Sequence, residues 1–523
     1  MKRLAGGLGQ ADRSLVLGVC VISAAAMVSG ATFNFVINPM VNDLDATESQ
    51  QSLLRQLPNI GALLVIFLAG VLGPRIGARR FLTWCGILMS LGYALVMVAP
   101  VMPVASLGLL LGSIGRQGLF VVVIGLISSR LASDDARATG FASMAAVTPA
   151  VYLVAPAVAG ALVGAVGWRA IVLVWVLSAG GAVLASRRML PADEAADGEA
   201  ATAGAGELWT PSIAGFVLAS LVQVFNNVSA AGWSSPKTVV WLLLAAASAV
   251  VLVVLMRRLA HPTLDITILR HGGIRLLLLV VVLIPFTNLW YYLTVGLQYV
   301  YGYSALQSAV IMMPSQAAGM AAAAATSGII RRRGLRFAGT LSLLIASMSM
   351  FLCMTQTTTT PLWIPVLILC LYSAAVTASG IPLTNAIMNL APRGGEGSAS
   401  AFRGAAGSLG AALGVVLMSS VVYGTFEDSL TRQLTAAGQD STQVAQVAEA
   451  LREGLTSEEV SSQYSVPLET VADIEAEQQQ AMVDAYRAQG LVGGVIVLGA
   501  SAAFFFNRRG LTSPADSPSS VAA

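Results

Sequence analysis

Apolar runs of about twenty residues recur along the whole chain, and short polar turns separate them. A helix of that length crosses the roughly 30 Å hydrocarbon core of a bilayer and satisfies its own backbone hydrogen bonds there. The pattern predicts an all-α polytopic membrane protein with fourteen transmembrane helices. We expect them at residues 14–39, 52–73, 81–101, 104–131, 139–165, 169–187, 210–229, 238–256, 274–297, 305–330, 337–357, 361–390, 401–424 and 489–507.

The turn at residues 70–80, GVLGPRIGARR, sets the orientation of these helices. It joins two apolar runs and contains Arg75, Arg79 and Arg80 without an acidic residue. Because basic residues concentrate in cytoplasmic loops, we expect this turn on the cytoplasmic side. With that assignment most of the 29 Lys and Arg residues, Arg403 included, fall on the cytoplasmic side, and both termini are predicted to be cytoplasmic.

Three segments are predicted to lie outside the membrane. Residues 189–209 are acidic and rich in Ala and Gly, which predicts a cytoplasmic linker, and residues 508–523 predict a disordered cytoplasmic tail. Residues 425–488 predict an outer loop of short amphipathic helices, interpreted as a solvated cap, with a partner-binding module as the alternative. These helices are expected at Ser429–Ala437, at Ser441–Glu453 and after Pro467.

The composition excludes the soluble classes of protein. The chain is 56% hydrophobic and 11% charged, whereas soluble domains contain roughly 25% charged residues. The four cysteines lie inside apolar runs without a CxxC spacing, so we expect buried thiols rather than disulfides or a metal site. The sequence contains no nucleotide-binding loop, metal-ligand cluster or nucleophile constellation. We therefore expect no enzyme, no cofactor and no nucleic-acid partner.

A faint internal repeat divides the predicted helices into two halves. Arg75-Ile-Gly-Ala-Arg79 recurs as Arg332-Arg-Gly-Leu-Arg336, in each case at a cytoplasmic turn. Two units of six helices, with two extra helices between them, explain the offset between the copies. Related halves that rock about a central site are typical of transporters. The predicted units are an N-terminal half at 1–188, the extra pair at 210–272 and a C-terminal half at 273–507.

The first copy of this repeat resembles the inner-loop motif of the major facilitator superfamily, Gly-x-x-x-Asp-Arg-x-Gly-Arg-Arg. The matching positions are Gly70, Arg75, Gly77, Arg79 and Arg80. The position of the family's acid holds Pro74. In the family this acid pairs with the arginines and with a neighbouring helix end to latch one conformation. Within the superfamily, the chain resembles the fourteen-span drug:proton antiporters, and the resemblance covers essentially the whole membrane part.

A second motif lies in the fifth predicted span. Pro156 and Gly160, within Ala155-Pro156-Ala157-Val158-Ala159-Gly160, are similar to the Gly-Pro motif that the family associates with antiport. Small residues permit close crossing of helices, and Pro156 allows this helix to kink. The resemblance therefore implies a role for both residues in conformational change.

Arg116, in the fourth predicted span, is the first candidate for contact with a substrate. A charge at this depth is expensive and by default functional, and it resembles the family's buried arginine on that helix. The alternative is a structural arginine satisfied by carbonyls or by Gln117. Neutral polar and aromatic side chains supply the other candidates, and with Arg116 they suit a bulky amphipathic or anionic ligand. They are Asn34, Asn59, Tyr152, Asn288, Trp290 and Tyr291.

No acidic residue lies inside a predicted span, although proton coupling needs a group in the membrane that gains and loses a proton. Asp43 and Asp45, just outside the first span, are the remaining candidates. The resemblance implies a secondary active transporter of the plasma membrane that exports hydrophobic or amphipathic compounds by alternating access. Proton coupling is implied only by the family. The alternatives are a lipid or glycolipid flippase of the same fold, and a receptor or scaffold that works through residues 425–488.

Overall fold

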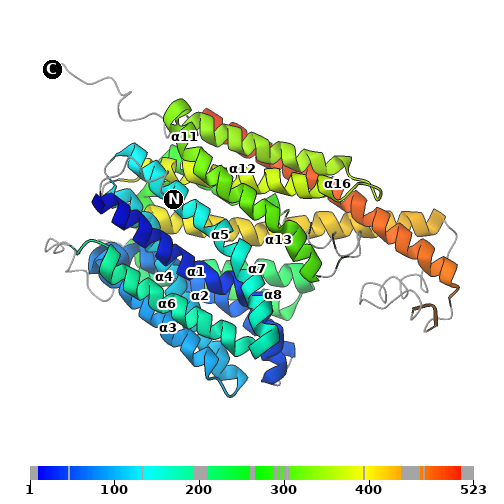
Figure 1. Ribbon diagram of the computed structural model, residues 1–523, viewed down its shortest axis with the longest axis horizontal. Coiled ribbons are helices and arrows are strands. Elements are labelled where there is room, and N and C mark those ends of the chain that lie inside the picture. Colours follow the sequence, from blue (N-terminus) through cyan, green and yellow to red (C-terminus); the bar gives the residue numbers. More distant parts are fainter. Residues whose placement is uncertain are drawn as a thin grey trace.

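The computed structural model of the chain is a bundle of long helices that run along a common direction (Figure 1). It describes residues 10–44, 48–131, 133–193, 209–258, 266–287, 289, 293, 297, 303, 305–392, 395–436, 460–462 and 466–507. Within these ranges the secondary structure is helical and contains no strand. The all-α prediction is confirmed for this part of the chain.

Six helices form the first part of the bundle, called here the α1–α6 half. They are α1 (Gln10–Asp43), α2 (Glu48–Ile76), α3 (Ala78–Met97), α4 (Met102–Arg130), α5 (Asp134–Val166) and α6 (Trp168–Met189). Trp175 of α6 donates its indole N–H to the Thr32 hydroxyl of α1 at 2.7 Å, and Tyr93 of α3 packs edge-on against Trp175. Polar atoms that pair across helices in this way can be buried in an apolar environment.

The remaining elements of the bundle form the α9–α16 half. They are η2 (Ile266–Arg270), α9 (Gly272–Leu283), η3 (Ile284–Thr287), α11 (Ala305–Leu352), η4 (Cys353–Thr355), α12 (Trp363–Leu390), α13 (Glu396–Ala436) and α16 (Leu468–Phe506). The Gln489 amide of α16 donates to the Thr287 carbonyl at 2.8 Å, and the Ser347 hydroxyl of α11 donates to the Gly494 carbonyl at 2.8 Å. These bonds fasten α16 to both η3 and α11.

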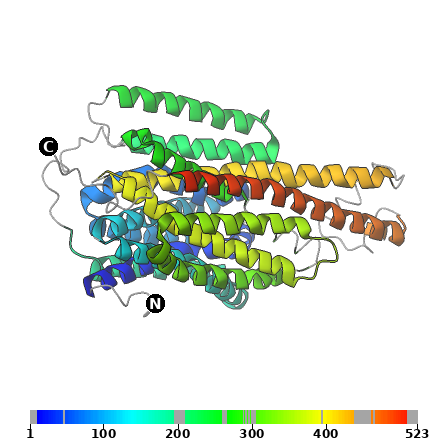
Figure 2. The same ribbon diagram turned by 90° about the horizontal axis from the view of Figure 1, so that it is seen from above.

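Two helices connect the halves in sequence and lie along one edge of the bundle. α7 (Trp209–Ala231) packs against α2 of the first half and α13 of the second, whereas α8 (Pro236–Arg258) packs mainly against α7. In Figure 2 this green pair lies along the edge opposite to the N-terminal end of α1. The pair therefore covers one of the two sides on which the halves meet.

Twelve helices in the described part are long and apolar enough to cross a membrane, so the predicted fourteen are not confirmed. One reason is that α11 contains two predicted spans, 305–330 and 337–357, which meet at Gly334 with a non-helical backbone (φ 80°, ψ 168°). A second reason is that the predicted span 274–297 is described only as α9, η3 and isolated residues. The count of fourteen and the sides of the termini stay predictions.

The predicted outer loop of short helices is wrong in its first part. α13 runs without a break from the apolar span to Ala436, so residues 429–436 are the end of a long helix rather than a separate one. The helix expected after Pro467 is confirmed as the start of α16, whose 39 residues extend over roughly 58 Å. Both helices project beyond the rest of the bundle (Figures 1 and 2). The predicted helix at 441–453, most of the 189–209 linker and the 508–523 tail lie outside the described residues.

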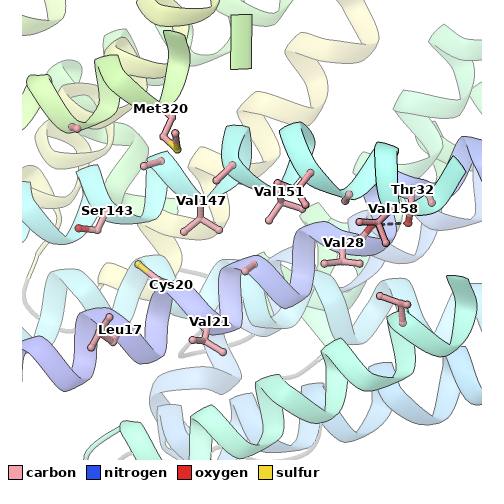
Figure 3. Close-up of a pocket in the computed structure, with 18 of the residues that line it drawn as sticks. Leu17, Cys20, Val21, Val28, Thr32, Ser143, Val147, Val151, Val158 and Met320 are labelled. Carbon is pink, nitrogen blue, oxygen red and sulfur yellow. Dashed lines mark hydrogen bonds between the residues drawn. The ribbon is translucent and has the colours of Figure 1, made fainter. Parts of the chain in front are cut away.

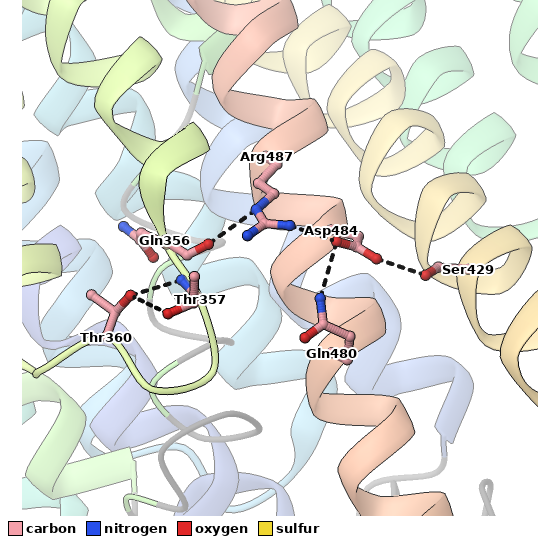
Figure 4. A network of polar contacts seen from close by, with 7 residues as sticks. All are labelled: Gln356, Thr357, Thr360, Ser429, Gln480, Asp484 and Arg487. Atoms are coloured by element: carbon pink, nitrogen blue, oxygen red, sulfur yellow. Dashed lines mark hydrogen bonds and ion pairs between the residues drawn. The ribbon is translucent and has the colours of Figure 1, made fainter.

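A polar network holds this projection to the bundle where α13 and α16 leave it (Figure 4). The Arg487 guanidinium contacts the Asp484 carboxylate at 3.2 Å and donates to the Gln356 carbonyl at 3.0 Å. The Ser429 hydroxyl of α13 donates to the other Asp484 oxygen at 2.9 Å. Asp484 therefore joins the two projecting helices, and Arg487 joins α16 to the turn after η4.

Candidate functional site

The matched motif residues are Gly77, between α2 and α3, and residues in the adjoining ends of these two helices. They lie at the basic end of the bundle, defined here by the helix ends that contain Arg79, Arg130 and Arg187. Gly77 begins α3 with φ 98°, a conformation that favours glycine. The Asp193 carboxylate, which follows α6, accepts the backbone N–H groups of Arg79 at 2.9 Å and Arg80 at 3.0 Å. A Cβ atom on Gly77 would collide with Asp193. An acid from a distant segment therefore caps α3.

The two halves are in direct contact at this basic end. A Cβ atom on Gly70 of α2 would lie 2.5 Å from the Gly397 carbonyl oxygen of α13, so each helix needs a glycine at the crossing. The Ser400 hydroxyl of α13 donates to the Val121 carbonyl of α4 at 2.8 Å. The Arg137 guanidinium of α5 donates to the Asn389 amide oxygen of α12 at 3.1 Å. The basic end is therefore closed.

Arg116 and Tyr152 meet between α1, α4 and α5. A Cβ atom on Gly30 of α1 would lie 3.6 Å from both the Arg116 guanidinium and the Tyr152 hydroxyl. The structure thus brings together two predicted site residues, beside a glycine that leaves room for them. Asn34 and Asn59 are exposed on α1 and α2.

A long apolar groove runs between α1 and α5, and α6 and α11 complete its walls (Figure 3). Its volume is about 850 Å³, and on α1 it extends from Leu17 to Thr32, a rise of roughly 22 Å. Among its lining residues only Thr32 and Ser143 have hydroxyl groups, and Thr32 already donates to the Val28 carbonyl at 2.8 Å. The groove offers aliphatic surface over most of the thickness of a bilayer core.

A smaller cavity of about 150 Å³ lies between the halves, enclosed by α4, α5, α12 and α13. Arg403 of α13 lines it together with Thr148 of α5, Thr384 of α12 and Phe120 of α4. The sequence predicts Arg403 on the cytoplasmic side, but α13 begins seven residues earlier, at Glu396. Arg403 is therefore two turns inside a helix that is long and apolar enough to span a membrane. In the sequence, the sign of this position is that Arg403 stands between small and apolar residues.

Helix α5 is the wall between the groove and the Arg403 cavity. Val147 and Val151 line the groove, whereas Met144 and Thr148 line the cavity. Pro149 and Pro156 both lie inside α5, where each removes a backbone hydrogen bond and permits bending.

The motif residues Pro156 and Gly160 lie in the part of α5 that packs beside α1. A Cβ atom on Gly160 would lie 3.8 Å from the Phe35 ring of α1, an ordinary contact. Their predicted conformational role is not tested by this geometry and stays a prediction.

Asp43 lies at the end of α1 that is remote from the basic end, in an ion pair with Arg169 (Nη1 to Oδ2, 2.5 Å). The hydrogen bond from Arg169, with a further one from the Trp168 indole at 3.2 Å, lowers the pKa of the Asp43 carboxyl below its ordinary value. The group therefore remains ionised at neutral pH. Asp45, Asn288, Trp290 and Tyr291 lie outside the described residues.

Comparison with known proteins gives one family and several related folds. The sequence profile of the Major Facilitator Superfamily matches residues 19–415. No curated protein matches the sequence. Among solved structures, the human organic anion transporter MFSD10 (TETRAN) has a TM-score of 0.61 at 15% identity, covering 94% of this chain and 100% of its own.

Two structures of a bacterial homologue of the iron transporter ferroportin, both in the outward-facing state, are also similar. One, soaked with iron, has a TM-score of 0.55 at 12% identity over 95% of this chain, and the other has 0.56 at 13% over 94%, each covering 100% of the homologue. At these identities the likeness shows the fold alone.

Proposed function

The chain belongs to the Major Facilitator Superfamily and is a membrane transporter, and we propose that it exports hydrophobic or amphipathic organic compounds by alternating access. We place it in the plasma membrane. The observation that carries the proposal is the apolar groove of about 850 Å³ between α1 and α5. Ligand pockets for drug-sized molecules have roughly 300–1,000 Å³ and mostly apolar walls.

The groove favours entry of the compound from the lipid. Val154, 58% exposed, and Leu17, 44% exposed, line it on the surface of the bundle. A molecule dissolved in the bilayer can reach such a surface without passing through water. Bending of α5 at Pro149 or Pro156 would then open a route from the groove to the space between the halves.

Two observations bear on the conformation and the charge of the substrate. The closed basic end suits an outward-facing state if this end faces the cytoplasm, and two of the similar structures are outward-facing. Arg116 and Arg403 favour amphipathic compounds with a negative group over cations. A transporter of organic anions is among the similar structures, in line with this preference.

Proton coupling is not part of the proposal. Because the Arg169 ion pair and hydrogen bonds lower the pKa of Asp43, that carboxyl does not change its protonation in the neutral range. Asp45, the other candidate, lies outside the described residues.

A flux assay in proteoliposomes tests the proposal. We expect radiolabelled chloramphenicol, a neutral amphipathic compound, to cross faster than in empty liposomes. Val154→Trp fills the groove and should reduce this flux about tenfold, which corresponds to losing on the order of 50 Å² of apolar contact. Leu243→Trp is the matched control, since Leu243 is 64% exposed on α8, outside the groove.

The same assay discriminates the alternatives. The assay is repeated with the anionic succinate ester of chloramphenicol and with a fluorescent phospholipid. If all three compounds cross only at the empty-liposome rate, a transporter of this kind is refuted. Flux of the phospholipid alone would favour the flippase, for which the lateral groove is also suitable. Equal effects of the Val154 and Leu243 variants would remove the groove from the pathway.

A further inference from the structure

We propose that the cavity around Arg403 is a binding site for a small anionic group, either the carboxylate or sulfonate of a transported compound or a free inorganic anion. This inference rests on the proposed function and specifies the charge of its substrate or co-substrate. It concerns a second site, separated by α5 from the apolar groove.

Among the described residues, Arg403 has no counter-charge. The Nε atom of Arg403 is buried and makes no hydrogen bond, and among the described residues no carboxylate pairs with the guanidinium. Of the four helices that line the cavity, α4 and α12 contain no acidic residue, α5 has acids only in its first turn, and α13 has them only at positions 396, 427 and 428. On α13 the nearest is Glu396, two helical turns or roughly 10 Å away along the axis. Arg403 is half-buried, and its buried Nε atom has lost water without gaining a partner, so an anion in the cavity would stabilise the guanidinium.

The hydrogen-bond donors of the cavity suit an anion. A guanidinium has five N–H groups in a planar fork that matches a carboxylate or sulfonate. The Thr148 hydroxyl lines the same cavity and adds one donor. Thr384 adds none, because its hydroxyl already donates to the Gly380 carbonyl at 2.6 Å. The remaining lining, including Phe120 and Met144, is apolar. Such a site binds one anionic group and excludes cations.

The size and position of the cavity suit a single anionic group. A cavity of about 150 Å³ accommodates a carboxylate with a few waters but not a whole drug-sized molecule, which needs roughly 300 Å³ or more. Arg116 and Phe120 are four residues apart on α4, and Tyr152 and Thr148 are four residues apart on α5, so each pair lies on one helix face. The Arg116–Tyr152 cluster is therefore about one helical turn, roughly 6 Å, from the Arg403 cavity along both helices.

Both halves of the bundle build the cavity. α4 and α5 come from the α1–α6 half, whereas α12 and α13 come from the α9–α16 half. Any rocking of the halves must enlarge or divide this cavity. Occupancy of the cavity by an anion is thus coupled to the movement of the halves.

Flux of a matched pair of compounds tests the site. Chloramphenicol and its succinate ester differ by one succinyl group, which adds a single carboxylate. We expect Arg403→Gln to lower the flux of the succinate at least about tenfold, as removal of one member of a buried charged contact does, with little change for the neutral parent. Arg403→Lys should recover part of the succinate flux. Thr148→Val should reduce it by a smaller factor. Arg336→Gln is the matched control, because Arg336 stacks on Phe505, 4.1 Å from the ring centroid, outside the cavity.

Replacement of sodium chloride by sucrose at equal osmolarity separates the two sources of the anion. If free chloride occupies the cavity, wild-type flux of the neutral compound falls without chloride and Arg403→Gln removes this dependence. If the compound's own carboxylate occupies it, chloride competes with the succinate ester instead. Either result supports an anion site.

A binding measurement keeps the inference testable if neither compound is transported, an outcome that would refute the proposed function alone. Sodium acetate should raise the melting temperature of the purified wild-type protein in detergent, by ligand linkage, and should not raise that of Arg403→Gln under the same conditions. The inference is overturned if Arg403→Gln has the melting temperature of the wild type without acetate and also matches it in three responses. These are the ratio of succinate flux to parent flux, the dependence of flux on chloride, and the effect of acetate on the melting temperature. Equal loss of both fluxes with an unchanged acetate response also overturns it.

Discussion

At the scale of single residues, Asp193 supplies a carboxylate close to Pro74, the residue that this chain has where the family motif has an acid. Its two bonds to the Arg79 and Arg80 amides satisfy N–H groups that a helix start leaves without partners. The negative charge also complements the positive end of the α3 dipole. Pro74 itself lies beside Gly397, where a Cβ atom would be 3.1 Å from the proline ring. We infer that Asp193, which lies outside the motif, takes the place of the acid that the motif lacks at Pro74.

Substitution of Asp193 measures this cap. Asp193→Ala should lower the free energy of unfolding by about 1 kcal/mol, the usual cost of losing an N-terminal cap, seen as a lower melting temperature in detergent. Asp193→Asn should retain most of the stability, since an amide oxygen also caps a helix. Equal melting of the Ala variant and the wild type would show that the cap contributes nothing.

At the scale of elements, the crossing of α2 and α13 holds the basic end closed. The two glycines, Gly70 and Gly397, let the backbones approach until Ser400 reaches the Val121 carbonyl on α4. The Phe67 and Phe402 rings pack edge-on beside the crossing, with centroids 5.3 Å apart. A side chain at either glycine must separate the helices, because backbone atoms face the added carbon and cannot turn away.

Gly397→Leu should therefore open the basic end. In a variant without the natural cysteines, a cysteine introduced by Ser400→Cys should react several-fold faster with a water-soluble maleimide when Gly397→Leu is also present. The control is Gly180→Leu on α6, where no neighbouring atom lies within 4 Å of an added Cβ. Unchanged reactivity at position 400 would contradict closure by this crossing.

The sequence predicts the helices better than their ends. Hydropathy locates the span at 401–424, but the backbone hydrogen bonds of α13 continue to Ala436, where apolar residues no longer dominate. Likewise the two spans predicted on either side of Gly334 both lie within α11, which has a kink at this glycine. Arg116 is predictable because it lies in the middle of an apolar run. Arg403 and Asp193 are not, since only the packing of α13 on α4, and of residue 193 on α3, gives them their surroundings.

At the scale of the whole molecule, the two sides on which the halves meet differ. α7 packs over the α2–α13 side, whereas the groove lies on the side where α5 meets α11 (Figures 2 and 3). Compounds dissolved in the membrane thus have an apolar approach on the α5 side, while α7 covers the other. The cavity of Arg403 lies between the halves, where their relative motion acts on it.

The central claim is that transport requires the halves to separate at the basic end. A reducible thiol cross-linker between Arg137→Cys and Asn389→Cys, whose native side chains are 3.1 Å apart across the halves, tests it directly in a variant without the natural cysteines. Thr340→Cys with Ser501→Cys is the control pair. Both residues belong to the α9–α16 half, where the Ser501 hydroxyl donates a hydrogen bond to the Thr340 backbone carbonyl. Cross-linking of the first pair should stop chloramphenicol flux in proteoliposomes and reduction should restore it, with no effect of the control pair. Undiminished flux through the cross-linked protein would contradict the account.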